Sequence, residues 1–293
     1  QEMGNIVAVT GDGVNDSPAL KKADIGIAMG ITGTDVAKEA ADMILSDDNF
    51  ASIVRAVEEG RSVYNNIRKF LRYIFDSNTP EAAAPALYLI SGGLIPVPLT
   101  IMQILTIDIG TDMVPALGLG AETAESSVMT KPPRSVKERL LNKNVILIGF
   151  LWYGFLGTIF ALGGYFLASF LNGWPGTALA AEGTKGYAEA TTMMLAGVVF
   201  SQMGMVLNNR TDYESVFKRG LFSNRYINAG LIIEVVILLA IIYVPFLNGI
   251  FNTAPISLIE WLYLICIPFI VFAVEELRKM ILRKYRAKRS AMK

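Results

Sequence analysis

The chain has 293 residues, of which 53% are hydrophobic and 18% are charged, and its mean hydropathy is +0.44. About one-quarter of the residues in a soluble domain are charged, so this composition favours a membrane protein. The formal net charge is +0, which argues against a nucleic acid as the main partner. The chain has no histidine and 1 cysteine, which excludes histidine metal sites and an internal disulfide.

The beginning of the chain predicts a small α/β segment. Residues 5–10 are expected to form a short strand, which leads through a turn rich in Gly and Asp into a helix over 17–23. A second strand over 25–29 and helices over 35–45 and 51–61 follow, and the last helix is expected to continue into the membrane. A strand followed by a Gly-rich turn and a helix is typical of a ligand site at the carboxyl edge of a parallel sheet.

The turn after the first strand predicts a site for phosphate and Mg²⁺. Asp12 offers carboxylate oxygens, which Mg²⁺ prefers, and Asp16 can bind the same ion or orient a metal-bound water or the nearby backbone. Gly11 and Gly13 let the backbone turn sharply and approach a phosphate closely. Asn15 can donate its amide to phosphate oxygens. The alternative is a plain turn, because Gly and Asp are common in turns.

Six long blocks, each long enough to cross a bilayer as a helix, predict six membrane spans. They lie at about 63–90, 97–118, 144–171, 189–207, 227–247 and 258–276. Lys and Arg gather after the second and fourth spans and in the tail 279–293, whereas the alternate connections hold only Lys185. Because cytoplasmic loops collect basic residues, both ends of the chain are expected in the cytoplasm. The tail is expected to be a solvated cap, and the alternative is contact with anionic lipid headgroups.

The first two predicted spans carry acidic residues. An ionised carboxylate near the bilayer centre costs about 2.5–3.5 kcal/mol, so it needs a partner or a function. Asn78 and Glu81 share one helix face, and Asp108, Thr111 and Asp112 share another. Pro and Gly residues in the same stretches free backbone carbonyls, which can bind cations where they line a cavity. These oxygens predict a cage for Na⁺, K⁺ or Ca²⁺, and the alternative is a polar network that only fixes helix packing.

Two parts of the sequence resemble the P-type ATPases. The segment from Thr10 to Met29 resembles their hinge motif, and residues 73–81 and 106–115 resemble their fifth and sixth transmembrane helices. The resemblance implies an α-helical polytopic membrane domain with six transmembrane helices. It also implies that a partial α/β phosphorylation domain of the haloacid-dehalogenase (Rossmannoid) fold precedes this membrane domain.

The expected domain boundaries follow from that resemblance. They are 1–62 for the phosphorylation-domain part, 63–278 for the transmembrane domain and 279–293 for the basic cytoplasmic tail. Asp12 is then implied to be the Mg²⁺ ligand of the phosphorylation site, with Asn15 and Asp16 as supporting contacts.

Residues of the first two predicted spans favour the sodium/potassium pumps within this family. Asp108 stands where calcium pumps typically have Asn, and Pro80 lies between Asn and Glu as in the sodium/potassium group. Ser77 stands where proton/potassium pumps carry Lys. The transported cation is therefore expected to be Na⁺ and/or K⁺, with a calcium pump as the alternative.

One further site departs from the family pattern. Sodium/potassium pumps use an acid of the eighth helix for an additional sodium site, and Met205 stands in its place. Glu234 in the ninth helix is kept, and an unusual Asp76 is present in the fifth. We hypothesise that Asp76 and Glu234 form a displaced extra site or share a proton, and a structural role is the alternative.

The resemblance implies that the intact protein couples ATP hydrolysis to cation export through an aspartyl-phosphate, with Mg²⁺ and ATP as cofactors. The sequence lacks the family's Asp-Lys-Thr-Gly-Thr and its Thr-Gly-Glu loop, so we expect the chain to be inactive without the N-terminal part of the pump. A multi-pass protein of the plasma membrane is implied, and the presence of an accessory subunit is left open. A membrane-anchored phosphatase and a non-catalytic ion-binding fragment are the alternatives from other classes.

Overall fold

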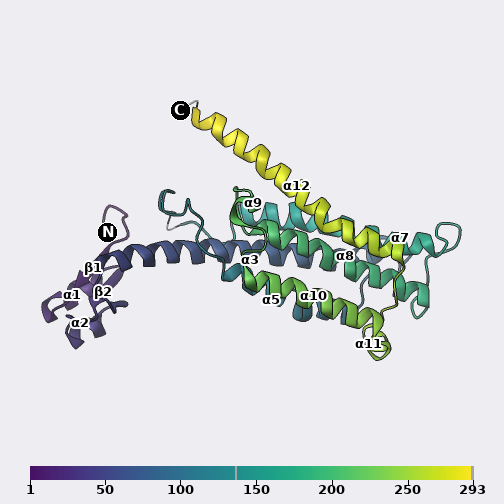
Figure 1. The fold of residues 1–293 in the computed structure, drawn as a ribbon, viewed down its shortest axis with the longest axis horizontal. Helices are drawn as coiled ribbons and strands as arrows, with labels where there is room; N and C mark the ends of the chain where they lie inside the picture. The colour runs from purple at the N-terminus through teal and green to yellow at the C-terminus, as the bar shows by residue number, and fades with distance from the viewer. Residues whose placement is uncertain (136, 292–293) are drawn as a thin grey trace. The chain divides into compact units, whose positions relative to one another are not determined.

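The computed structural model describes residues 1–135 and 137–291 (Figure 1). The chain divides into two compact units. The first unit holds Gln1–Ser62 and Ser126–Lys131, and the second holds Val63–Glu125 and Pro132–Lys293. Helix α3 (Phe50–Ile90) begins in the first unit and ends in the second.

The first unit is built on a parallel sheet, which has three strands in the order β1-β2-β3 among the described residues. Its elements are β1 (Ala8–Gly11), η1 (Val14–Asp16), α1 (Ser17–Lys22), β2 (Ile25–Met29), α2 (Asp35–Ala40) and β3 (Met43–Leu45). Parallel neighbours need a crossover connection, which α1 and α2 supply. The buried side chains of Leu20, Ala28 and Ala37 form the core of this unit.

Several predicted elements of the first unit are present, but two boundaries were wrong. The strand over 25–29 and the helix beginning at Ser17 are confirmed, whereas the first strand begins only at Ala8. The predicted helix over 35–45 ends at Ala40, because the chain then pairs with β2 as a third strand. The Asp42 carboxylate accepts a hydrogen bond from the Gly26 N–H at 2.8 Å, which fixes the chain where it leaves the helix.

The second unit is helical. Its elements after α3 are α4 (Ile101–Leu105), η2 (Thr106–Thr111), α5 (Met113–Gly120), α6 (Lys143–Ile146), η3 (Leu147–Gly154), α7 (Phe155–Leu171), α8 (Lys185–Asn209), α9 (Val216–Arg219), α10 (Arg225–Tyr243), α11 (Pro245–Phe251) and α12 (Leu258–Ala291). The segments η2 and η3 are π-helical, so each widens the backbone within a longer helical run.

Four helices in the described part of the chain are long and apolar enough to cross a membrane. They are Lys143–Leu171, Lys185–Asn209, Arg225–Tyr243 and Leu258–Tyr285. They coincide with the last four predicted spans, but the predicted end of the fifth span at residue 247 was wrong. Helix α10 ends at Tyr243, because Pro245 lacks an N–H and begins the short helix α11 instead.

Helix α8 forms the centre of the second unit, where it packs between α7 and α12 (Figure 1). Of its apolar window, 89% is buried, compared with 28–39% for the other three helices of this kind. Glycines allow the close approach: a Cβ at Gly197 would lie 2.8 Å from the Cα of Ala161, and one at Gly164 would lie 2.7 Å from the Met193 carbonyl oxygen. Gly164 of α7 and Gly197 of α8 thus let the two helix backbones approach closely.

Candidate functional site

The turn after β1 is shaped by Asp16. Its Oδ2 accepts hydrogen bonds from the backbone N–H groups of Asp12, at 3.1 Å, and Gly13, at 3.0 Å. A Cβ at Gly11 would lie 2.5 Å from the Asp16 Cβ, so only glycine leaves room for this side chain. The side chains of Asp12 and Asn15 are exposed.

The geometry gives the two aspartates of this turn different roles. Asp16 is engaged with the backbone, whereas Asp12 presents its carboxylate outward beside the carboxyl end of β1. No group of three or more His, Cys, Asp or Glu side chains in the described ranges is arranged to hold a metal ion. The turn therefore fits Mg²⁺ through one carboxylate, and the other oxygens that the ion needs must come from a phosphate or from elsewhere.

Asp48 organises the neighbouring turn after β2 and was missed by the sequence analysis. Its carboxylate accepts hydrogen bonds from the N–H groups of Gly30, Ile31 and Thr32 at 2.6, 3.0 and 2.8 Å. These bonds, the one from Ile31 most of all, lower the pKa of Asp48 to about 2. The φ of Asp48 is 49°, in the left-handed region that Asp tolerates better than most residues. An Asp in this loop was therefore the sequence signal that could have indicated a turn.

The predicted cation cage is only partly assembled inside the second unit. Glu81, Thr111 and Asp112 are buried, whereas Asn78 and Asp108 are exposed. The carboxyl of Glu81 lies close enough to those of Asp108 and Asp112 for their charges to repel one another. Glu81 of α3 and the two acids in and after η2 therefore lie within electrostatic range of one another, but among the described residues they are not arranged as a group of three that holds a metal ion.

The side chains of this group are only partly satisfied by the protein. Tyr73 donates its hydroxyl to Oδ1 of Asp112 at 3.3 Å, and Asn78 donates its amide to the Ile74 carbonyl at 2.7 Å. Oε1 of Glu81 and Oδ2 of Asp112 are buried without a hydrogen-bond partner among the described residues. Buried polar atoms are normally paired, so these oxygens indicate a missing proton or cation.

The backbone at the cage is π-helical. The Asp112 N–H donates to the Ile107 carbonyl at 2.9 Å, five residues earlier, which widens the helix at Gly110. The helix-breaking residues predicted an irregular backbone here, and the structure shows that it takes the form of a π-helix. Such segments are frequent at functional sites because they redirect side chains and carbonyls.

Asp76 and Glu234 are fully buried, and each has both carboxylate oxygens without a hydrogen-bond partner in the part of the chain that the structure describes. Each lies within electrostatic range of Asp112. The Gln202 amide of α8 is also buried, and its nitrogen and oxygen have no partner among the same residues. Met205, in contrast, is part of the apolar core.

Asp76 lies where three helices come together. A Cβ at Gly157 of α7 would be 3.3 Å from Oδ1 of Asp76 and 3.3 Å from the hydroxyl oxygen of Ser201 in α8. The absence of a side chain at Gly157 therefore leaves room beside the carboxylate. The sequence analysis did not assign Ser201 or Gln202 to a site. Polar residues within a hydrophobic helix could have indicated that both belong to one.

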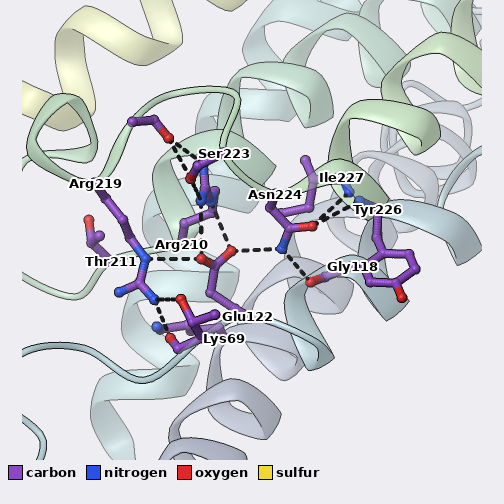
Figure 2. Close-up of polar contacts among 12 residues, drawn as sticks. Lys69, Gly118, Glu122, Arg210, Thr211, Arg219, Ser223, Asn224, Tyr226 and Ile227 are labelled. Carbon is purple, nitrogen blue, oxygen red and sulfur yellow. Dashed lines mark hydrogen bonds and ion pairs between the residues drawn. The ribbon is translucent and has the colours of Figure 1, made fainter.

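A second polar cluster joins the segment after α5 to the segment after α8 (Figure 2). The buried Glu122 accepts hydrogen bonds from Nε and Nη2 of Arg210 at 2.8 and 3.1 Å, from Arg219 at 2.9 Å and from Asn224 at 2.9 Å. Burial by itself would raise the pKa of Glu122, but the bonds from Arg210 and Asn224 hold it below its usual value. We call Glu122 and these three partners the Glu122 clamp.

Helix α3 is tied to the same two segments. Lys69 and Glu125 form a buried ion pair at 2.9 Å, and Arg72 pairs with Asp212. Asn209 donates its amide to the carbonyl of Lys69. The helix that carries Asp76 and Glu81 is thus anchored, through charged groups, beside the Glu122 clamp.

Comparison with known proteins identifies two matching families. Residues 96–281 match the family model of the cation transporting ATPase C-terminus, and residues 4–57 match that of the haloacid dehalogenase-like hydrolases. The chain is 42% identical to a sodium/potassium-transporting ATPase subunit alpha-2 from Gallus gallus and 41% identical to that from Homo sapiens, in each case over 97% of its length. The subunit alpha-4 from Rattus norvegicus is also 42% identical over 97% of the chain. The chain spans 30% of the length of each of these relatives.

Proposed function

This chain belongs to the cation-transporting P-type ATPases, and we propose that it forms the C-terminal part of an ATP-driven pump for Na⁺ and/or K⁺. In this proposal it supplies the phosphate and Mg²⁺ turn and the intramembrane cation site. Proteins named sodium/potassium-transporting ATPases match over nearly the whole chain, and Asp108 favours the same cations over Ca²⁺.

The membrane topology is part of the proposal. We propose six transmembrane helices, with α3 and the run from α4 to α5 added to the four apolar ones. The domains would be the C-terminal part of a haloacid-dehalogenase-like phosphorylation domain over 1–62, the transmembrane domain over 63–278 and the basic tail over 279–293. The basic connections support cytoplasmic ends, and we propose the plasma membrane as the place of this pump.

The observation that carries the proposal is a pair of buried carboxylate oxygens, one on Glu81 of α3 and one on Asp112 directly after η2, which have no hydrogen-bond partner among the described residues. A bound cation compensates the cost of burying these charges, and its binding removes the repulsion among Glu81, Asp108 and Asp112. Asn78 uses its nitrogen within its own helix, so its carbonyl oxygen is the atom available to a cation. Thr111 donates to the Ile107 carbonyl at 3.1 Å, and its oxygen can also accept a cation.

The turn after β1 would serve the phosphorylation chemistry. Asp12 would hold Mg²⁺, which neutralises negative charge on a phosphoryl group when it is bound there. Gly11 and Gly13 let the backbone approach that group, Asn15 offers an amide to it, and Asp16 holds the turn in shape through its two backbone contacts. The phosphorylated Asp and the ATP site would lie in the N-terminal part of the pump, so we propose that this chain alone forms no phosphoenzyme from radiolabelled ATP.

Asp76 and Glu234 would provide an additional site for a cation or a shared proton. Its support is the full burial and the missing hydrogen-bond partners of both carboxyls among the described residues, with the unpaired Gln202 amide on the neighbouring α8. Asp76 on α3 would thus replace the acid that is absent from position 205. It lies close to α8 because Gly157 has no side chain between Asp76 and Ser201.

The decisive experiment measures ATPase activity of the full-length protein titrated separately with Na⁺, K⁺ and Ca²⁺. We expect activation by Na⁺ and/or K⁺, and we expect Glu81→Gln and Asp112→Asn to weaken the apparent cation affinity at least tenfold, because each removes a charged ligand. Glu182→Gln is the matched control, since Glu182 is exposed in the connection between α7 and α8. Activation by Ca²⁺ alone would favour a calcium pump, and unchanged affinities in both site variants would refute the cage.

A further inference from the structure

A cavity of about 370 Å³ lies in the second unit, and none of the cage residues lines it. Its walls come from α3, from the first turns of α6 and η3, from the segment after α8 and from α12 at Arg278 and Leu282. Its volume falls in the range of about 300–1,000 Å³ that is typical of small-ligand pockets. The proposed pump function assigns no role to this cavity.

The lining is amphipathic and carries an excess of positive charge. Arg68, Arg72 and Arg278 line it together with a single acid, Asp212. The rest of the wall is mainly aliphatic and includes Ile148 and Leu282. A ligand that suits both parts has an anionic group and an apolar group next to it.

The three arginines are not equally satisfied. Arg72 pairs with Asp212, and Arg278 makes two hydrogen bonds to Glu275, at 2.6 and 2.7 Å. Arg68 makes only a long contact with Glu138, at 3.4 Å, and its Nε is buried without a hydrogen-bond partner among the described residues. The planar guanidinium group of arginine can form two parallel hydrogen bonds to phosphate or carboxylate oxygens. Since Arg68 has the fewest contacts of the three, it is the group best placed to bind an anion.

The position of the cavity indicates which anion is available. Asn144 and Ile148 belong to the first turns of one apolar helix, and Arg278 and Leu282 belong to the last turns of another. The cavity therefore lies at the end of these helices where Lys and Arg gather in the sequence. Basic pockets between membrane helices at this level are suited to the headgroups of anionic lipids.

We propose that this cavity binds the headgroup of an anionic phospholipid. The phosphate contacts Arg68 and the outer side of Arg278, and the glycerol and first acyl carbons lie against Ile148 and Leu282. The aliphatic wall favours a lipid over a free phosphate ion, which has no apolar part to bury. A bound lipid would join α3 to η3 and α12, so the helix that carries the cage acids would be held by lipid as well as by protein.

The test counts bound lipids on the full-length protein by native mass spectrometry, after reconstitution in phosphatidylcholine nanodiscs with and without phosphatidylserine. We expect Arg68→Gln to lower the affinity for the retained phosphatidylserine about fivefold, the factor associated with one basic side chain near an anionic surface. Leu282→Trp fills the aliphatic part without changing the charge and should lower the occupancy as well. Arg225→Gln is the matched control, because Arg225 is exposed on α10 and does not line the cavity.

Each outcome decides the proposal. An equal loss in Arg68→Gln and Arg225→Gln would show only general surface attraction and would overturn it. If millimolar inorganic phosphate occupied the cavity equally well without phosphatidylserine, the cavity would be a site for a free anion. This result would also overturn the proposal. A protein segment seated in the cavity of the full-length protein, seen by electron cryo-microscopy, would do the same. Loss in Arg68→Gln and in Leu282→Trp, with retention in the control, would support a lipid site.

Discussion

The second unit contains two groups of buried acids that are chemically alike and yet satisfied in opposite ways. Glu122 is 5% exposed and is held by two arginines and an asparagine, and the nearby Asp212 pairs with Arg72. Asp76 and Glu234 are 1% and 0% exposed, and the described residues give their oxygens no hydrogen-bond partner. Burial alone therefore does not distinguish a structural acid from a candidate ion ligand.

The presence or absence of a protein partner makes the distinction. In the clamp, Glu122 and its partners fix two inter-helical segments to each other and need nothing else. In the cage and around Asp76, carboxylate oxygens have no hydrogen-bond partner among the described residues. A bound cation or a proton can compensate the cost of burying them. The two groups should consequently respond in different ways when a single carboxyl is neutralised.

The largest effect is expected at the clamp. Glu122→Gln leaves the buried Arg210 and the partly buried Arg219 without the counter-charge of Glu122, and removing one partner of a buried pair costs about 3–5 kcal/mol of stability. Thermal unfolding of the full-length protein in detergent should show a clear drop in Tm. Glu138→Gln is the control, since Glu138 is about one-third exposed and its contact with Arg68 is long, so its loss should cost less than about 1 kcal/mol. An equal Tm for both variants would contradict the structural role of the clamp.

A smaller and opposite effect on stability is expected at Asp76. Asp76→Asn replaces a buried carboxyl that has no hydrogen-bond partner among the described residues, so we expect stability to be unchanged or to rise by about 1 kcal/mol. If Asp76 belongs to an extra site, the same variant should weaken the apparent affinity for the activating cation or change the number of ions transported. A cation-activation series measures the first quantity, and flux measurements give the second. Unchanged affinity and stoichiometry would refute the extra site, and a large loss of stability would show that Asp76 has a structural partner.

The smallest effect is expected at Asp48, an acid that is paired but exposed. Its pKa is lowered to about 2 from 3.8, so its contribution to stability is present above pH 4 and is lost as the pH falls through 2. Asp48→Asn should remove this dependence and speed hydrogen exchange at Gly30, Ile31 and Thr32 at neutral pH. Asp35→Asn is a suitable control in the same unit. Exchange rates that do not change in the Asp48 variant would mean that its hydrogen bonds do not order the turn.

Much of the fold was predictable because the relevant signals are local. The strand over 25–29, the helix from Ser17, the continuous helix α3 and four apolar helices follow from periodicity, Gly and Pro placement and hydrophobic length. The third strand was not predictable in this way, because Met43–Leu45 becomes a strand by pairing with β2. Helix propensity near residue 40 gives no information about that partner.

The candidate site was predictable as a set of residue types but not as a set of contacts. Acids at three- and four-residue spacing indicated the cage, and the structure brings Glu81, Asp108 and Asp112 within electrostatic range of one another. The roles of Asp12 and Asp16 could not be separated from their spacing, because only the folded turn directs one of them to the backbone.

The sequence by itself determined the membrane character of this protein, its family and the acids that are too costly to bury without a function. Those properties depend on composition, length and spacing, which are local to the chain. Only the tertiary structure decided which acids are satisfied, because their partners lie far away in sequence: Arg210 reaches Glu122 from 88 residues away, and Gly157 of α7 makes the room beside Asp76. The distinction between a clamp and a candidate ion site is thus a property of contacts between helices, and no single segment contains it.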